Sequence, residues 1–310
     1  MVLALVTAHD APQHLAPREV PEPSPAPDEA VVDVHAVSVN QGELRLLAAR
    51  PDGWRPGQDV AGVVRHEAAD GSGPPPGTPV VAWVDDGGWA QRLAVPTPRL
   101  VALPDTVDLA AAATLPVAGV TALRVLRRGG LLAGRAVLVT GASGGVGRFA
   151  VELAAVSGAR VTGVTSRTSR AAGLLELGAA DVVHDVRDAT TRFDLILESV
   201  GGASLSATPS MLARDGVLVV FGNSSREPST LSFAALMDSP DARIEVFRVY
   251  ESHDAATRRQ DLARLVAFVA DGRLHPRIGV EVDHHDAGAA LRALAAREVE
   301  GKAVIRFRAT

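Results

Sequence analysis

The sequence predicts a two-part α/β protein, because its pattern changes near residue 113. Residues 1–113 contain short β segments separated by turns rich in proline and glycine, typical of a β-rich, barrel-like domain. From residue 114 onwards apolar strands alternate with helices, which is typical of a parallel sheet covered on both faces. We therefore expect a Rossmann-like, doubly wound sheet over 114–251, with 252–310 returning to the first domain.

The first part contains four segments in which apolar and polar residues alternate as in strands. They are "AVVDVHAVSV", "DVAGVVRHEA", "TPVVAWV" and "WAQRLAVP". Two tracts rich in proline, "PEPSPAPDE" and "DGSGPPPGTP", are expected to be turns.

The second part begins with an alanine-rich helix expected to run through Leu126. The next elements are strand "RAVLVTG", helix "VGRFAVELAAVSG", strand "RVTGVTS", helix "SRAAGLLELG", strands "DVVHD" and "FDLILESV", helix "LSATPSMLA" and strand "GVLVVFG". After residue 251 come helix "ATRRQDLARLVAFVADG", a short strand, helix "DAGAALRALAARE" and strand "KAVIRF".

The composition of the chain excludes several classes of function. With 310 residues, 47% hydrophobic and 22% charged, the chain is expected to be a globular protein with sizeable cores. A net charge of −5 without a basic block argues against nucleic acid or a membrane as the partner and favours a small molecule. No cysteine is present, which excludes disulfides, thiolate nucleophiles and cysteine-bound zinc. No signal peptide or membrane-length segment is recognised, so a cytoplasmic location is expected.

One glycine cluster, "VLVTGASGGVGRFAVELA", satisfies three motifs. Residues 141–145 spell the G-x-S-x-G of a hydrolase elbow, with Ser143 as nucleophile. Residues 140–147 spell the T-G-x-x-x-G-x-G of short-chain dehydrogenases. Residues 142–147 spell A-x-G-x-x-G, a dinucleotide-binding turn whose first glycine is alanine.

Two of these motifs fit the rest of the chain poorly. A serine hydrolase using Ser143 would need Asp194 with His253 or His275, and it would not explain the residues that end the next strand; it is kept as a remote alternative. Short-chain dehydrogenases use a Tyr-x-x-x-Lys pair, whereas the only tyrosine, Tyr250, has no lysine four residues on.

The dinucleotide turn has a direct physical basis. Gly144 would let the backbone approach a pyrophosphate, and Gly147 would let the helix pack closely on the strand. The residue that recognises the ribose is expected about 20 positions on, where Ser166 stands, followed by Arg167 and Arg170. A hydroxyl and two guanidinium groups suit a 2′-phosphate, so the expected cofactor is NADPH. The alternative is that both arginines are solvated residues at a helix start.

Several segments together resemble the medium-chain dehydrogenase/reductase superfamily, in its zinc-independent quinone oxidoreductase and enoyl reductase branch. They are "AVSVNQGEL", "GQDVAGVV", "LPVAGVTAL", "GASGGVG", "FDLILESVGG", "GVLVVFG" and "EGKAVIRF", which extend over nearly the whole chain. The resemblance implies a GroES-like β-rich catalytic domain (1–113 and 252–310) and a Rossmann doubly wound parallel sheet domain (114–251).

The zinc-dependent branch has a cysteine where Asn40 stands, and Gly-His-Glu where this chain has Gly57-Gln58-Asp59. Neither segment offers a thiolate or imidazole, so no metal is expected. His284 and His285 are adjacent, so we expect their side chains to diverge and to have surface or packing roles.

The resemblance also implies site residues. It places Asn40 and Thr121 beside the nicotinamide, and Lys302 matches the terminal Gly-Lys pair, with a role at the cofactor or in the structure. The remaining cofactor residues are Ser143, Gly144, Gly145 and Val146 at the pyrophosphate, Ser166, Arg167 and Arg170 at the adenosine phosphate, and Val200, Gly201, Phe221, Gly222 and Asn223 at the nicotinamide.

Two positions depart from the family. Arg45 stands where related quinone reductases often have an active-site tyrosine, which favours an anionic or strongly polarised carbonyl substrate; the alternative is a surface arginine. Asp185 replaces a tyrosine that often packs on adenine, and its charge would need Arg170 or Arg187 to offset it.

The expected reaction is hydride transfer from NADPH to a quinone or to the β-carbon of an α,β-unsaturated carbonyl. The resulting enolate needs a hydrogen-bond donor, which is commonly worth about 3 to 4 kcal/mol, and Asn40 and Arg45 are the candidates. A non-catalytic NADPH-binding sensor or scaffold is the alternative. The segment "ARIEVFRVY" (242–250) has the pattern of an edge strand, and the family pairs such a strand across a dimer axis, so a homodimer is expected.

Overall fold

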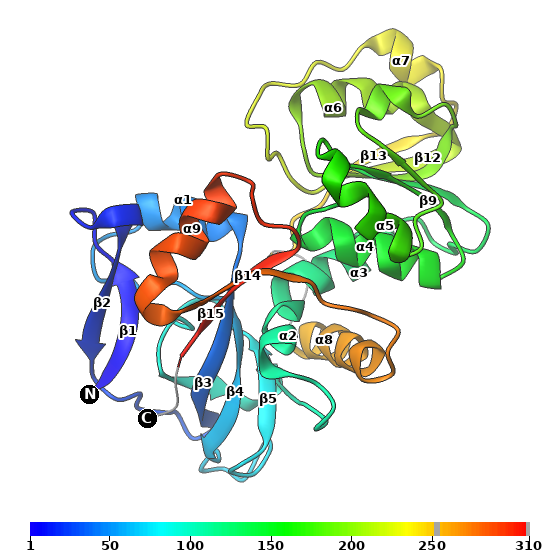
Figure 1. Ribbon diagram of the computed structural model, residues 1–310. Coiled ribbons are helices and arrows are strands. Elements are labelled where there is room, and N and C mark those ends of the chain that lie inside the picture. Colours follow the sequence, from blue (N-terminus) through cyan, green and yellow to red (C-terminus); the bar gives the residue numbers. More distant parts are fainter. Residues whose placement is uncertain (251–254, 308–310) are drawn as a thin grey trace. The chain divides into compact units, whose positions relative to one another are not determined.

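The computed structural model describes residues 1–250 and 255–307. The chain divides into two compact units, one of Met1–Val120 with His253–Thr310 and the other of Thr121–Ser252. Both units combine sheets with helices, so the predicted two-domain α/β fold is confirmed (Figure 1).

The first unit is built around a seven-stranded sheet, in the order β14-β15-β3-β4-β5-β7 with β6 also paired to β3. All neighbours are antiparallel except β14 and β15. The strands are β3 (Glu29–Val39), β4 (Asp59–His66), β5 (Pro79–Trp83), β6 (Arg92–Pro96), β7 (Leu100–Ala102), β14 (Ile278–Asp283) and β15 (Lys302–Arg306), with a separate hairpin of β1 (Val2–Thr7) and β2 (Leu15–Val20).

The end of the chain completes this sheet, since β15 pairs with β3 and places Ala303 opposite Val39. Helix α1 (Gln41–Ala49), which follows β3, lies beside α9 (Ala287–Ala295), where the Gln41 side chain donates to the Leu294 carbonyl at 3.1 Å (Figure 1). The C-terminal elements thereby bring Lys302 next to the end of β3.

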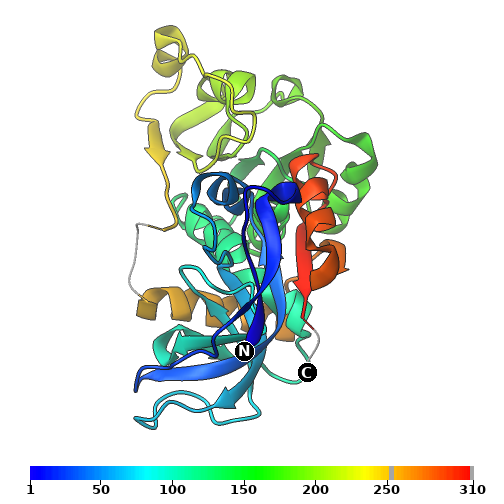
Figure 2. The ribbon, with the colours of Figure 1, turned by 90° about the vertical axis from the view of Figure 1, so that its left-hand side faces the viewer.

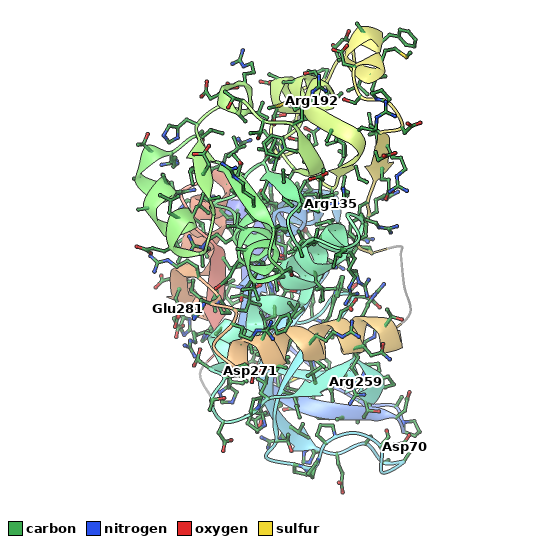
Figure 3. The ribbon with its side chains drawn as sticks, turned by 90° about the vertical axis from the view of Figure 1, so that its right-hand side faces the viewer. Asp70, Arg135, Arg192, Arg259, Asp271 and Glu281 are labelled. Carbon is green, nitrogen blue, oxygen red and sulfur yellow. The ribbon has the colours of Figure 1, made fainter. Side chains whose placement is uncertain are left out.

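Helix α8 (Ala255–Ala270) packs against β5 and β7 (Figure 2). Arg259, labelled in Figure 3, donates to the Leu100 carbonyl at 2.9 Å and fixes the helix to the sheet edge. The other helical segments of this unit are η1 (Pro12–His14), η2 (Thr97–Arg99), α2 (Leu109–Ala113), η3 (Leu115–Gly119) and η7 (His284–Asp286).

The helix expected to continue to Leu126 is instead three segments. Helix α2 ends at Ala113, a π-helical turn η3 follows, and α3 spans Val120–Arg127. Pro116 lies inside η3, and its missing N–H interrupts the regular α-helical hydrogen-bond ladder.

The second unit holds six parallel strands in the order β10-β9-β8-β11-β12-β13, the Rossmann order. The chain starts at β8 and moves first towards β10 and then towards β13, so the winding reverses beside β8. The strands are β8 (Ala136–Val139), β9 (Arg160–Val164), β10 (Asp181–Val183), β11 (Phe193–Glu198), β12 (Leu212–Val220) and β13 (Arg243–Val246).

Helices connect these strands, and the sheet contributes Leu138, Phe193, Ile196 and Leu218 to a hydrophobic core. The connecting helices are α4 (Gly145–Val156), η4 (Thr168–Arg170), α5 (Ala171–Glu176), η5 (Val186–Asp188), α6 (Gly202–Ala207), η6 (Thr208–Met211) and α7 (Phe233–Met237). Because the strands are parallel, the loops after β8, β9, β11 and β12 all leave the same edge. Across the described ranges, we find no helix with the length and apolar character needed to cross a membrane.

Candidate functional site

A buried polar cluster lies where β3 ends and α1 begins in the first unit. Asn40 has an extended backbone and is the N-cap residue of α1, and its own N–H donates to the Glu43 carboxyl group at 2.7 Å. This is the reciprocal bond of a capping box, with the acid at the third helical position. Asn40 is 8% exposed and Glu43 is fully buried, so the helix start is also a polar site inside the protein.

Asp59, the first residue of β4, is the centre of this cluster. The register places Asp59 opposite Ser38, whose hydroxyl donates to Asp59 Oδ2 at 2.5 Å. The same oxygen accepts from Asn40 Nδ2 at 2.9 Å, and Oδ1 accepts from the Val117 backbone N–H at 2.9 Å. Although Asp59 is fully buried, both oxygens have partners, as a buried carboxylate requires.

Lys302, the only lysine in the chain, supplies the opposite charge from the start of β15. Its ammonium donates to the Val39 carbonyl at 3.0 Å and to Asn40 Oδ1 at 2.5 Å, and lies 3.4 Å from Asp59 Oδ2. The Asn40 amide oxygen therefore accepts a hydrogen bond from a cation, and the amide nitrogen donates one to an anion.

Glu43 is a second buried acid in the same cluster. Burial, and then the nearby charge of Asp59, raise the pKa of Glu43 from 4.5 to about 8. Hydrogen bonds from the backbone N–H groups of Asn40 and Gln58, and the charge of Lys302, oppose this rise only in part. At neutral pH Glu43 is thus a neutral acid beside one buried ion pair.

Arg45 does not join this cluster. It is exposed on α1, two residues beyond the buried Glu43. Two residues correspond to about 200° of rotation in an α-helix, so Arg45 faces away from the side on which Glu43 and Leu47 are buried.

In the second unit, the turn that follows β8 and the turn that follows β9 meet at Ser143. Its hydroxyl accepts from Thr165 Oγ1 at 3.1 Å and from the Arg170 guanidinium at 3.5 Å. Ser143 is buried, Arg170 is half-buried, and Ser166 and Arg167 are exposed in the loop between them. The structure therefore brings Ser143 and Arg170 together.

The glycines of this turn differ in how much room they have. Gly144 is the N-cap residue of α4, with Gly145 and Val146 in its first turn. A Cβ at Gly147 would lie 2.3 Å from the Gly141 carbonyl oxygen, whereas a Cβ at Gly144 would lie 3.3 Å from that atom. Gly147 is thus required for the contact between helix and strand.

Asp185 forms a two-bond ion pair with Arg187, at 2.8 and 2.6 Å. Hydrogen bonds from Arg187 lower the pKa of Asp185 to about 2. Arg187, one of the two arginines considered as partners for this acid, pairs with it.

The turns after β11 and β12 also lie together. Buried Glu198 accepts from the Gly201 N–H at 2.9 Å, and the Phe221 N–H donates to the Glu198 carbonyl at 2.9 Å. A Cβ at Gly201 would lie 2.1 Å from Asn223 Oδ1, so these turns are in close contact. The structure thus groups five predicted residues, namely Val200, Gly201, Phe221, Gly222 and Asn223, at one edge. Thr121 is buried near the start of α3.

Comparisons with known proteins agree with this architecture. Residues 145–270 match the family described as zinc-binding dehydrogenase. The chain is 36% identical over 149 residues to the chloroplastic quinone-oxidoreductase QR1 of Triphysaria versicolor, a match that covers 43% of this chain and 45% of the relative. The chain thus matches about half the length of such curated relatives.

Solved structures match along almost the whole chain. A probable oxidoreductase from Mycobacterium abscessus is 28% identical with a TM-score of 0.86, over 99% of both chains. The Escherichia coli quinone oxidoreductase complexed with NADPH is 20% identical with a TM-score of 0.87, over 98% of this chain and 100% of that one, and shows the shared fold. These matches support the predicted resemblance to the quinone oxidoreductase branch of the medium-chain dehydrogenase/reductase superfamily.

The position of Asp194 does not support the hydrolase alternative. Asp194, the aspartate of the hydrolase alternative, accepts hydrogen bonds from the Ala136 N–H at 2.8 Å and from the Arg135 guanidinium at 2.9 Å. Ala136 begins β8, whereas Ser143 follows its other end, so the strand separates the two side chains. Of the two candidate histidines, His253 lies outside the described residues, and His275 belongs to the first unit.

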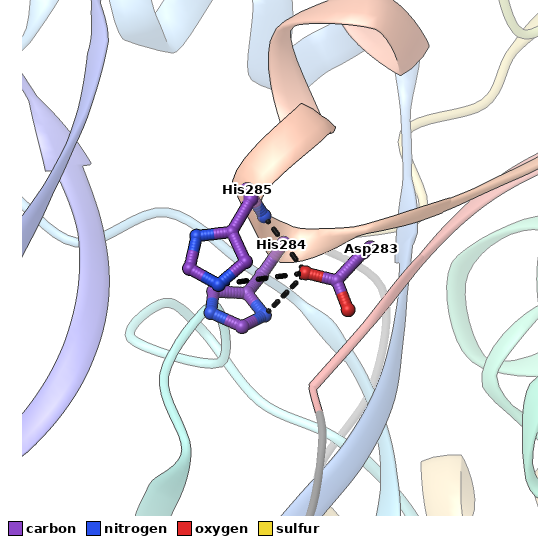
Figure 4. Close-up of side chains that lie close together, drawn as sticks. All are labelled: Asp283, His284 and His285. Atoms are coloured by element: carbon purple, nitrogen blue, oxygen red, sulfur yellow. Dashed lines mark hydrogen bonds and ion pairs between the residues drawn. The ribbon is translucent and has the colours of Figure 1, made fainter.

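The expectation that His284 and His285 diverge is wrong. Figure 4 shows both rings beside Asp283, with ring centroids 3.9 Å apart and ring nitrogens 3.0 and 3.9 Å from Asp283 Oδ1. The pair lies in the turn η7, capped by Asp283, where the alternation of a regular strand no longer applies. His284 also stacks on Phe307, in keeping with a packing role.

Sequence reasoning missed the residues that hold the site together. Glu43 went unnoticed although the spacing Asn-x-x-Glu at 40 and 43 matches a capping box. Asp59 was considered only as part of a degenerate zinc motif. Glu198 bonds within its own turn, to the Gly201 N–H and the Ser204 hydroxyl, but no motif marks it in the sequence. Thr165 carries no short-range signal for its bond to Ser143, which is 22 residues away.

Proposed function

We propose that this protein is an NADPH-dependent reductase that transfers hydride to a quinone or to the activated C=C bond of an α,β-unsaturated carbonyl. The observation that carries the proposal is the meeting of Arg170 with Ser143 in the glycine turn of a Rossmann sheet. A half-buried cation at that position favours an anionic, phosphate-bearing nucleotide.

The preference for NADPH rests on the loop after β9. Ser166, Arg167 and Arg170 provide a hydroxyl and two cations, and the acid at 185 is neutralised by Arg187. Arg170→Ala should therefore weaken NADPH binding about tenfold, the effect of one charge-assisted hydrogen bond, with a smaller effect on NADH. Arg160→Ala is the matched control, because Arg160 is exposed and lies at the other end of β9.

Once bound, NADPH would supply the hydride, and this chain would need to stabilise the negative oxygen that forms. We assign that role to Asn40, because an amide held in place is a pre-organised hydrogen-bond donor. Arg45 is the weaker candidate, since it is exposed and faces away from the cluster.

We propose that the reaction proceeds without zinc. The family match named for zinc covers 145–270, whereas the positions equivalent to the metal ligands lie in the first unit. There Asn40 and Asp59 are hydrogen-bonded to each other and to a lysine ammonium. An amide, a carboxylate and an adjacent cation do not form the thiolate and imidazole set that zinc prefers.

The test measures oxidation of NADPH and of NADH with a 1,4-quinone, a linear 2-enal, a cyclic enone and an enoyl thioester. Turnover of one class with NADPH preferred would support the proposal and identify the substrate type. NADPH binding without turnover of any acceptor would instead favour the sensor or scaffold function. A lack of binding of either nucleotide would refute both.

We also propose a homodimer formed through β13. This strand is the edge of the six-stranded sheet, and Ile244 and Val246 on it are 39% and 77% exposed. An exposed apolar edge strand is a ready template for pairing with a second strand.

A further inference from the structure

We propose that Lys302 and Asp59 are positioning residues that lock the Asn40 side-chain amide in one orientation, leaving the second N–H of Nδ2 as the donor to the substrate oxygen. The inference rests on the proposed reductase function and assigns a task to residues which that function does not yet use.

The contacts define the orientation of the amide. Asn40 Oδ1 accepts from the Lys302 ammonium at 2.5 Å, and Asn40 Nδ2 donates to Asp59 Oδ2 at 2.9 Å. A flipped amide would place its N–H groups against the ammonium and its oxygen against the carboxylate. Both contacts would then be repulsive, and they would be strongly so inside the protein, where charges are poorly screened.

The two positioning residues are themselves held by the sheet. Ser38 pairs with Asp59 across β3 and β4, and Val39 pairs with Ala303 across β3 and β15. Asp59 and Lys302 each stand at the first residue of a strand bonded to the end of β3. Sites built on paired strands hold geometry better than sites built on loops.

The hydrogen bonds of Lys302 also favour this task over direct binding of a nucleotide. Its ammonium has three N–H donors, and the three acceptors around it are the Val39 carbonyl, Asn40 Oδ1 and Asp59 Oδ2. The side chain is 4% exposed. The donors are therefore taken up within the cluster, and the effect of Lys302 on catalysis passes through Asn40.

Burial of an ion pair here is poorly explained by stability alone. Replacing a buried ion pair with apolar side chains is often neutral or stabilising, so such pairs are weak contributors to folding. An ion pair that bonds to both the oxygen and the nitrogen of one amide has a more specific consequence, because it determines which N–H of that amide is left to bind a ligand.

The kinetic test uses Lys302→Ala, which removes the propylammonium part of the side chain. We expect kcat to fall about 100-fold, the cost of a small misplacement at a reacting centre, while the Kd for NADPH changes less than about threefold. Added propylammonium should restore at least a tenth of the lost rate, whereas 1-propanol, its neutral counterpart, should not. Arg306→Ala, which removes a half-exposed cation from the same strand, is the control and should retain the wild-type kcat.

A second measurement does not depend on activity or on wild-type turnover. In the wild-type protein, NMR of the Asn40 side chain should show two distinct, slowly exchanging amide protons, one shifted by its bond to Asp59. In Lys302→Ala this pair should move and broaden. An unchanged Asn40 amide signal would overturn the positioning role, even if the variant were slow.

The two proposals fail in different ways. If the wild-type protein reduces no acceptor, the reductase function fails, and the NMR result still decides whether Lys302 orients Asn40. If the wild-type protein is active and Lys302→Ala matches it in kcat, the positioning inference fails while the reductase function stands.

Discussion

Asp59 accepts a hydrogen bond from the backbone N–H of Val117 at 2.9 Å, which ties the start of β4 to the π-helical turn η3. The other oxygen of the same carboxylate accepts from Ser38 and Asn40 at the end of β3. One side chain thus joins two strands and the turn that leads into α3. Single π-helical turns are frequent at functional sites, and here the turn is anchored by the acid that orients Asn40.

Asp59→Asn should destabilise the protein by about 3 to 5 kcal/mol, because it leaves the buried Lys302 ammonium without its counter-charge. The measurement is urea unfolding followed by circular dichroism. Asp33→Asn is the matched control, since Asp33 pairs with two arginines at the surface and should contribute less than about 1 kcal/mol. Equal losses in both variants would contradict a buried ion pair at Asp59.

The raised pKa of Glu43 predicts a pH dependence of stability. Between the ordinary value of 4.5 and about 8, the folded protein keeps a proton that the unfolded chain has released. The unfolded state therefore binds fewer protons, and the free energy of unfolding falls as pH rises through this window. For this group the slope is at most about 1.4 kcal/mol per pH unit, and it vanishes above pH 8.

Glu43→Gln isolates that contribution. Because glutamine does not titrate, the variant should lose this slope when urea unfolding is compared at pH 5, 6, 7 and 8. Its amide nitrogen cannot accept a hydrogen bond, so one backbone N–H loses a partner, at a pH-independent cost of about 1 to 3 kcal/mol. Glu19→Gln, an exposed acid on β2, is the control. A variant with the wild-type slope would show that Glu43 is not the titrating group.

The Rossmann unit was predictable because its signals are local. Alternating strands and helices, and the glycine turn before α4, lie within contiguous segments, and each strand predicted between 136 and 222 is observed. The break between α2 and α3 was missed, although Pro116 marks it, because the alanine-rich composition favoured one helix.

The buried cluster was much harder to predict. Asn40 was singled out from the resemblance, but its partners Asp59 and Lys302 lie 19 and 262 residues away in the sequence and meet only through strand register. Arg45 was also chosen from the resemblance, as the counterpart of an active-site tyrosine, and the helical phase that turns it away from the buried face depends on where α1 begins.

Two alanine substitutions in the glycine turn should separate an effect on protein stability from an effect on NADPH binding. Gly147→Ala places a Cβ 2.3 Å from a backbone oxygen, so overpacking of about 1 to 3 kcal/mol should exceed the gain of up to about 1 kcal/mol in helix propensity. Gly144 has a φ of −81°, which alanine can adopt, and a Cβ there would lie 3.3 Å from its nearest neighbour, the Gly141 carbonyl oxygen. The melting temperature of Gly144→Ala should therefore stay near that of the wild type while NADPH binding weakens. A stable Gly147→Ala protein would contradict the packing argument.

The edge strand gives the last prediction. If two copies pair through β13, Val246→Lys should place a charge in that interface and shift the protein from dimer to monomer in sedimentation at micromolar concentration. Leu131→Lys is the control, because Leu131 is 80% exposed in the same unit but precedes β8 and lies outside β13. A wild-type monomer would refute the dimer. A dimer unaffected by Val246→Lys would place the interface on another surface, because lysine on an edge strand is a common device against strand pairing.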